Sequence, residues 1–246
     1  MALLRTIVLT LVVCSPILGF AEDELVVLRA GQLIDGRSQE PVRPGIVLIR
    51  GERIEAAGSD IEIPQGARVI DLGGATLLPG LIDLHTHLTD AVGAHWEEVL
   101  VTTTPAEAAL HGAVNARTTL MAGFTTVRDM GPTWSFTDVD LRDVIDQGLL
   151  PGPRMQVAGN YVSATGGAGD ARQFSVYVDV PSVRNLADGV DAVRAAVRTN
   201  LKYGADFTKI LATGAVLSKG ISPGAQQYSD EELAVAVEET GRWERF

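Results

Sequence analysis

Short hydrophobic runs alternate with longer amphipathic stretches along the chain, and the rhythm changes near residue 79. Before that residue, apolar and β-branched runs are separated by prolines and paired glycines, which predicts a small β region. After it, four apolar runs alternate with helical periodicity, which predicts four strand–helix units. The predicted strands cover residues 25–28, 46–49, 67–72, 81–87, 124–127, 154–158 and 206–211.

Helix-starting signals mark two of the amphipathic stretches. Thr104 stands three residues before Glu107 and is followed by Pro105, which predicts a capped helix N-terminus. Ser229 and Glu232 repeat this spacing before the last predicted helix. Two apolar stripes at helical spacing are expected to face the core: Ala109, Ala113, Ala116 and Leu120, and then Leu186, Val190, Val193, Val197 and Leu201.

Strand–helix units in series favour a parallel sheet with right-handed crossovers. A closed (β/α)₈ barrel needs eight such units and about 250 residues. The expected fold class is therefore α/β, with a partial (β/α)₈ TIM-type barrel of about four units over residues 79–246. A small β-sandwich region over residues 22–78 is expected to precede it.

Residues 1–21 have the pattern of a secretory signal peptide. Arg5 is their one charged residue, an apolar run covers residues 7–18, and the small residues Gly19 and Ala21 predict cleavage after Ala21. The apolar run is shorter than the roughly 20 residues that a bilayer span needs, so an uncleaved anchor is the weaker alternative. The sequence predicts a secreted or periplasmic protein without membrane attachment after cleavage.

Composition narrows the classes of partner and of metal site. The 246 residues contain 20 basic and 31 acidic side chains, for a formal net charge of −11. This charge argues against nucleic acids and anionic membranes as partners, because both require basic patches. The one cysteine, Cys14, lies within the predicted signal peptide, so the mature chain has no disulfide and no Cys-ligated zinc. A metal would have to use histidine, carboxylate or a modified side chain.

The strongest chemical signal is His85-Thr86-His87 at the end of a predicted strand. Side chains at positions i and i+2 of a strand point to the same side, which at the carboxyl end of a barrel strand is the mouth of the active site. Imidazole is a good ligand for zinc and related divalent ions. Asp83 could orient one of the rings. A structural histidine pair remains the alternative.

Three longer motifs contain or accompany these histidines: VIDLGGATLLPGLIDLHTH (69–87), AGFTTVRD (122–129) and FTKILATG (207–214). The first resembles the start of the barrel in the metal-dependent amidohydrolase superfamily. The other two are similar to the second and fourth strands of its imidazolonepropionase-like and Xaa-Pro dipeptidase-like branch. The similarity covers about residues 26–239. Because residues 239–246 do not lead into the expected fifth strand, the chain is expected to be truncated after the fourth unit.

The resemblance implies a hydrolase of C–N bonds in peptides, amides or cyclic amides that uses a metal-activated water, with dipeptide-like substrates favoured. It implies that His85 and His87 bind a divalent metal, zinc in the first place, as one or two ions. Lys209 would join them as a CO₂-derived carbamate; a lysine in a buried salt bridge is the alternative. The family's proton-shuttle aspartate falls beyond the chain end, so no catalytic residue is assigned and this chain alone is expected to be incomplete and poorly active. Tyr228 and His95 are candidate substrate contacts.

Two other functions stay open at this point. A catalytically incompetent, truncated remnant of such an enzyme would contain the two histidines and the lysine without a shuttle acid. A periplasmic solute-binding module would need neither the His85–His87 pair nor Lys209, so it ranks last. The expected partner is a small-molecule or dipeptide substrate, and a homo-oligomer is left open.

Overall fold

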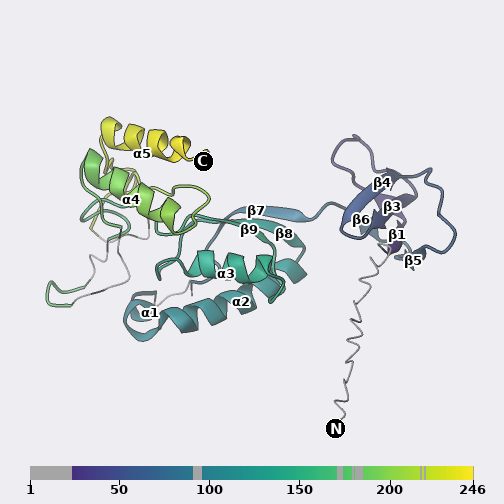
Figure 1. The fold of residues 1–246 in the computed structure, drawn as a ribbon, viewed down its shortest axis with the longest axis horizontal. Helices are drawn as coiled ribbons and strands as arrows, with labels where there is room; N and C mark the ends of the chain where they lie inside the picture. The colour runs from purple at the N-terminus through teal and green to yellow at the C-terminus, as the bar shows by residue number, and fades with distance from the viewer. Residues whose placement is uncertain are drawn as a thin grey trace, which may run out of the picture. The chain divides into compact units, whose positions relative to one another are not determined.

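The computed structural model describes residues 24–90, 96–170, 174–178, 180, 185–216, 218 and 220–245. The predicted signal peptide lies outside these residues. The described chain divides between Pro79 and Gly80 into two compact units, the first drawn purple to blue and the second teal to yellow in Figure 1. No helix in the described ranges is long and apolar enough to cross a membrane.

The first unit is built from short strands, as the sequence predicts. A four-stranded sheet has the order β4-β3-β1-β5, in which β5 is parallel to β1 and the other pairs are antiparallel. A second, two-stranded sheet pairs β2 with β6. Gly51, with φ +56°, occupies the tight turn between β3 and β4. The strands are β1 (Leu25–Ala30), β2 (Gln32–Leu33), β3 (Gly45–Arg50), β4 (Arg53–Gly58), β5 (Arg68–Asp71) and β6 (Thr76–Leu77).

The second unit contains a parallel sheet of the order β7-β8-β9 (Figure 1). Helix α2 packs against β8 and α3, α3 also contacts β9, and α4 packs against α5. This strand–helix alternation confirms the predicted α/β class. The elements are β7 (Leu81–Thr86), α1 (Trp96–Thr102), α2 (Pro105–Met121), β8 (Phe124–Asp129), α3 (Thr137–Asp146), β9 (Arg154–Val157), α4 (Val190–Lys202) and α5 (Asp230–Arg242).

The predicted fourth strand is only partly regular. Ile210 forms an isolated parallel bridge with Val162, and the Val162 N–H donates to Lys209 O at 2.8 Å. At the start of the predicted strand, the Asp206 N–H donates to Val157 O at 2.8 Å. Residues 206–211 therefore lie beside β9 and the chain that follows it. Regular pairing fails because Gly159, with φ +63°, turns the chain just after β9.

Both predicted helix caps are confirmed. The Thr104 hydroxyl accepts a hydrogen bond from the Glu107 N–H at 3.2 Å, and Ser229 with Glu232 forms a complete capping box. Helix α4 begins at Val190 because Gly189, with φ +82°, precedes it. The predicted stripe member Leu186 therefore lies outside the helix, whereas three further members are buried in it: Val193, Val197 and Leu201.

The buried face of α2 matches the predicted stripe only in part. Ala116 is buried as predicted, together with Ala108 and Gly112, whereas Ala109 and Ala113 are only partly covered. The reason is close packing: a Cβ atom on Gly112 would lie 2.7 Å from the Thr89 side chain. The helix approaches its neighbours through its smallest residues, not through its most hydrophobic ones.

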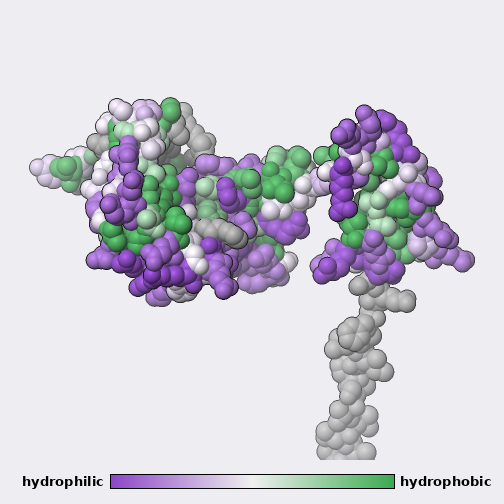
Figure 2. Space-filling model, turned by 90° about the horizontal axis from the view of Figure 1, so that it is seen from above, coloured by the Kyte–Doolittle hydropathy of each residue, from purple (hydrophilic) through white to green (hydrophobic). Residues whose placement is uncertain are grey.

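Strand β7 leaves apolar side chains in contact with solvent. Ile82 is 61% exposed and Leu84 is 57% exposed, and Leu110 and Val114 are exposed on α2. Within the described ranges, β7 pairs with β8 along one edge and with no strand along the other. Figure 2 shows hydrophobic surface among the hydrophilic residues of both units.

Candidate metal site

The carboxyl end of β7 brings the two predicted histidine ligands together. His85 is the second-to-last residue of β7, and His87 follows the strand directly. Their ring centroids are 5.4 Å apart and the ring planes are inclined by 58°. His85 is exposed and His87 is half-buried. Two imidazoles therefore lie close together on one side of the strand end, as the strand alternation predicts.

The His87 ring is held by a backbone carbonyl. Its Nδ1 atom lies 2.7 Å from Gly131 O, so Nδ1–H donates and Nε2 is the ring nitrogen left to bind a metal. A metal-ligating histidine commonly gives its other ring N–H to such an acceptor. Asp90 Oδ2 is more distant, at 3.9 Å from the same nitrogen. The hydrogen bond to Gly131 O therefore fixes the orientation of the His87 ring, as is common for a histidine that binds a metal.

The charges around His85 and Lys209 favour their neutral forms. Burial and the nearby Lys209 ammonium lower the pKa of His85, and the charges of His87 and Arg128 lower it further. Burial and the Arg128 guanidinium also lower the pKa of Lys209. A neutral imidazole is the metal-binding form, and a neutral amine is the form that can add CO₂. The same guanidinium would stabilise an anionic carbamate on Lys209.

The donor set fits a metal only if Lys209 takes part. Among the described residues, no group of three or more His, Cys, Asp or Glu side chains lies close enough to hold a metal ion. Two imidazoles alone fall short of the three protein ligands that a catalytic zinc site has. A third ligand would have to come from another side chain, and Lys209, whose charge contributes to the lowered pKa of His85, is the one that the sequence predicts.

Two charged residues near the histidines, Asp83 and Arg128, bond the backbone of β7 and not the rings. Asp83 Oδ1 accepts a hydrogen bond from the backbone N–H of His85 at 3.0 Å, so this carboxylate shapes the strand end and does not orient a ring. The Arg128 Nε–H donates to Leu84 O at 3.1 Å, and the guanidinium lies 5.5 Å from the centre of the Phe207 ring. Arg128 thus supports the edge between β7 and residues 206–211.

Tyr228 does not offer a substrate contact. Its side chain is 2% exposed and packs in the core cluster shared by α4 and α5. Its hydroxyl donates to Ala187 O at 3.0 Å, and burial raises the pKa of this phenol. The expectation from its loop position is therefore corrected to a structural role. The other candidate substrate contact, His95, lies outside the described residues.

Tyr228→Phe is expected to lower the free energy of unfolding by about 1 kcal/mol, because the buried Ala187 carbonyl loses its donor. Zinc affinity and substrate turnover should stay as in the wild type. Urea denaturation and zinc titration measure the two quantities. Unchanged stability combined with a raised KM would instead assign Tyr228 to substrate.

The structure adds Asp129 to the residues around the candidate site. Asp129 is fully buried at the end of β8. Its Oδ2 accepts hydrogen bonds from the Leu88 N–H at 2.7 Å and from the Thr86 hydroxyl at 3.3 Å. Burial raises the pKa of Asp129 to about 6. Its position at the end of the AGFTTVRD motif was the available signal.

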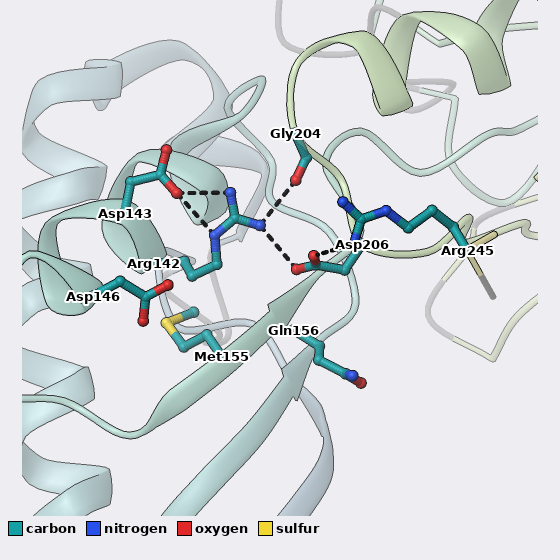
Figure 3. Close-up of a pocket in the computed structure, with 8 residues that line it drawn as sticks. All are labelled: Arg142, Asp143, Asp146, Met155, Gln156, Gly204, Asp206 and Arg245. Carbon is teal, nitrogen blue, oxygen red and sulfur yellow. Dashed lines mark hydrogen bonds and ion pairs between the residues drawn. The ribbon is translucent and has the colours of Figure 1, made fainter. Parts of the chain in front are cut away.

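A separate cavity of about 360 Å³ lies on another part of the second unit (Figure 3). None of the predicted metal ligands lines it. The Arg142 guanidinium donates to Asp206, Asp143 and Gly204 O, and Arg245 pairs with the other oxygen of Asp206. Four of the charged residues that line the cavity are therefore paired with one another. Its lining consists of Arg142, Asp143, Asp146, Met155, Gln156, Gly204, Asp206 and Arg245.

Comparison with known proteins shows which family the chain belongs to. The model of the amidohydrolase family matches residues 76–244. The chain is 30% identical to ochratoxinase from Aspergillus niger, over 92% of this chain and 50% of that protein. Members of the family generally use divalent metal ions.

Solved structures of similar proteins agree in fold. The chain is similar to a Xaa-Pro dipeptidase with methionine bound in its active site, with 31% identity, a TM-score of 0.82, and coverage of 91% of this chain and 55% of that one. It is also similar to a prolidase in complex with N-methylphosphonate-L-proline, with 30% identity, a TM-score of 0.79, and coverage of 89% and 54%. The chain spans about half the length of the relatives it matches. By its sequence motifs, its parallel sheet and these matches, the chain belongs to the amidohydrolase family.

Proposed function

We propose that the protein is a metal-dependent hydrolase that cleaves a C–N bond in a dipeptide-like or cyclic amide substrate. The observation that carries the proposal is the pair of His85 and His87 rings, 5.4 Å apart at the carboxyl end of β7, with the His87 Nδ1–H donated to Gly131 O. This end of the strands is where parallel α/β barrels carry their active sites. Membership of the amidohydrolase family supports the class of reaction.

In this proposal His85, His87 and a carbamate on Lys209 hold zinc or a similar divalent ion. Such an ion supplies Lewis acidity, which lowers the pKa of a coordinated water and polarises a carbonyl. The protein's own part is to favour the neutral form of His85 and to orient the ring of His87. Burial lowers the pKa of His85, which does the first, and the hydrogen bond from His87 to Gly131 O does the second.

Names of the similar proteins support a dipeptide-like substrate. A Xaa-Pro dipeptidase and a prolidase with a proline-containing phosphonate are among the similar solved structures. A substrate of this kind presents an amide carbonyl that a divalent ion can polarise. Dipeptides with a C-terminal proline are therefore the first substrates to test.

Export and a small-molecule partner belong to the same proposal and rest on the sequence. The pattern of residues 1–21 supports secretion or periplasmic location with cleavage after Ala21. A net charge of −11 supports a partner other than nucleic acid.

The test compares the zinc-loaded protein with the double variant His85→Ala/His87→Ala. The wild type should bind zinc and hydrolyse Xaa-Pro dipeptides only weakly, because no residue of the chain is assigned as the proton shuttle. The double variant should lose both properties because two of three ligands are gone. Zinc content by mass spectrometry and proline release by chromatography are the two measurements.

Each other outcome contradicts part of the proposal. Zinc binding through the histidines without hydrolysis of any amide in a dipeptide and cyclic-amide panel would establish a catalytically incompetent remnant. Equal zinc content in the two proteins would remove the proposed metal site altogether.

A further inference from the structure

Residues 129–133, at and just after the end of β8, form several hydrogen bonds with residues 86–90, at and just after the end of β7. The Met130 N–H donates to Thr86 O at 2.8 Å, and the Thr133 N–H donates to Asp90 Oδ1 at 2.8 Å. Between these two bonds lie the contacts of Asp129 and the bond from His87 to Gly131 O. The segment that contains His87 is therefore attached at several points to one neighbouring loop.

Asp129 makes its contacts on both sides of His87. Its Oδ2 accepts from the hydroxyl of Thr86, the residue before the histidine, and from the N–H of Leu88, the residue after it. The parallel register of β7 and β8 places Thr86 directly opposite Asp129. One buried carboxylate oxygen thus fixes the backbone that carries the His87 ring.

We propose that Asp129 is a positioning residue for the metal site, which holds the His85-Thr86-His87 segment in its metal-binding conformation. The inference rests on the proposed function, because it concerns the same ligands. A group that orients a metal ligand contributes to affinity without touching the metal, and loss of such a group costs about 10- to 100-fold in metal affinity.

Burial of this carboxyl group is costly, which argues for a specific role. Asp129 is completely shielded from solvent, and its second oxygen, Oδ1, has no hydrogen-bond partner among the described residues. An apolar residue of similar volume would avoid the cost of burying a polar group with an unsatisfied atom. Only an acceptor at this position can bond both residues that flank His87.

The test measures zinc affinity by competition with a chromophoric chelator, together with the absorption spectrum of the Co(II)-loaded protein. Asp129→Ala should weaken zinc binding by about 10- to 100-fold and alter the Co(II) bands. Asp129→Asn should bind within about threefold of the wild type, because the amide oxygen still accepts from the Leu88 N–H.

Asn200→Ala is the matched control for general destabilisation. Asn200 is also fully buried, and its side chain bonds Asn160 O and the Asn185 amide. This variant should be destabilised like Asp129→Ala and still bind zinc with wild-type affinity. If Asp129→Ala does not fold, Asp129→Leu fills the same space without an acceptor and should show the same loss of affinity.

The possible results separate the two proposals. Wild-type affinity in Asp129→Ala or Asp129→Leu overturns the positioning role, and so does an equal loss in Asn200→Ala. A wild-type protein that binds no zinc overturns the proposed function instead, before any variant of Asp129 is compared.

Discussion

Replacement of Gly131 by alanine is expected to lower the free energy of unfolding by about 2 to 4 kcal/mol. Gly131 has φ +103°, a backbone conformation that side chains disfavour. A Cβ atom there would lie 2.9 Å from Gly159 O and 3.3 Å from Tyr161 N. Because both neighbours are backbone atoms, relief requires the chain itself to move. Urea denaturation of the metal-free protein measures the loss.

Gly148→Ala supplies the matched control for Gly131→Ala. Gly148 also has a positive φ, +72°, but open space surrounds the position of its Cβ. This variant should lose only about 1 kcal/mol through backbone strain. The difference between the two variants isolates the steric cost beside Gly159. Equal losses would show that Gly131 has room for a side chain and that its carbonyl is not held in place by close packing.

The metal-free protein is expected to lose stability as the pH rises from about 4 to about 7. Burial, together with the nearby Asp90 carboxylate, raises the pKa of Asp129 to about 6. Burial, together with the Asp129 carboxylate, raises the pKa of Asp138 to about 7. In the unfolded chain both groups ionise near pH 4. Between these values the folded protein retains protons that the unfolded chain releases, so the free energy of unfolding falls with pH.

The expected fall is on the order of 7 kcal/mol, since the two pKa values are raised by about 2 and about 3 units and one unit corresponds to about 1.4 kcal/mol. The lowered pKa of His85 acts in the opposite direction, but this ring is exposed and contributes little. Asp129→Asn removes one of the two titrations, so its stability should depend less on pH and exceed that of the wild type by about 3 kcal/mol at pH 7. Denaturation curves at several pH values in the presence of a chelator measure both. A rise in stability over this range would contradict the buried state of the two carboxyl groups.

Short-range features of the fold were predictable because they depend on a few adjacent residues. The caps at Thr104 and Ser229 each involve a window of four residues, and both form as expected. The irregularity of the predicted fourth strand, residues 206–211, could not be foreseen in the same way, because regular pairing depends on a partner segment elsewhere in the chain. Gly159 turns that partner away, and only Ile210 completes a bridge.

The candidate site shows the same division. His85 and His87 share a side of β7 because of strand geometry, which the sequence reveals. The contacts of Asp129 depend on the register of β7 against β8, which joins residues about forty positions apart and has no local signal. Tyr228 was misjudged for a related reason: its burial results from the packing of α4 and α5.

The attachment of residues 86–90 to residues 128–133 has a consequence for how the protein opens. Proteins fluctuate through local opening of cooperative units whose stabilities differ. The two histidines and the groups that hold them belong to one such unit, formed by β7, β8 and the loops that follow them. Transient separation of α4 from α5 would leave the contacts between residues 86–90 and 128–133 intact, and both imidazoles would keep their positions.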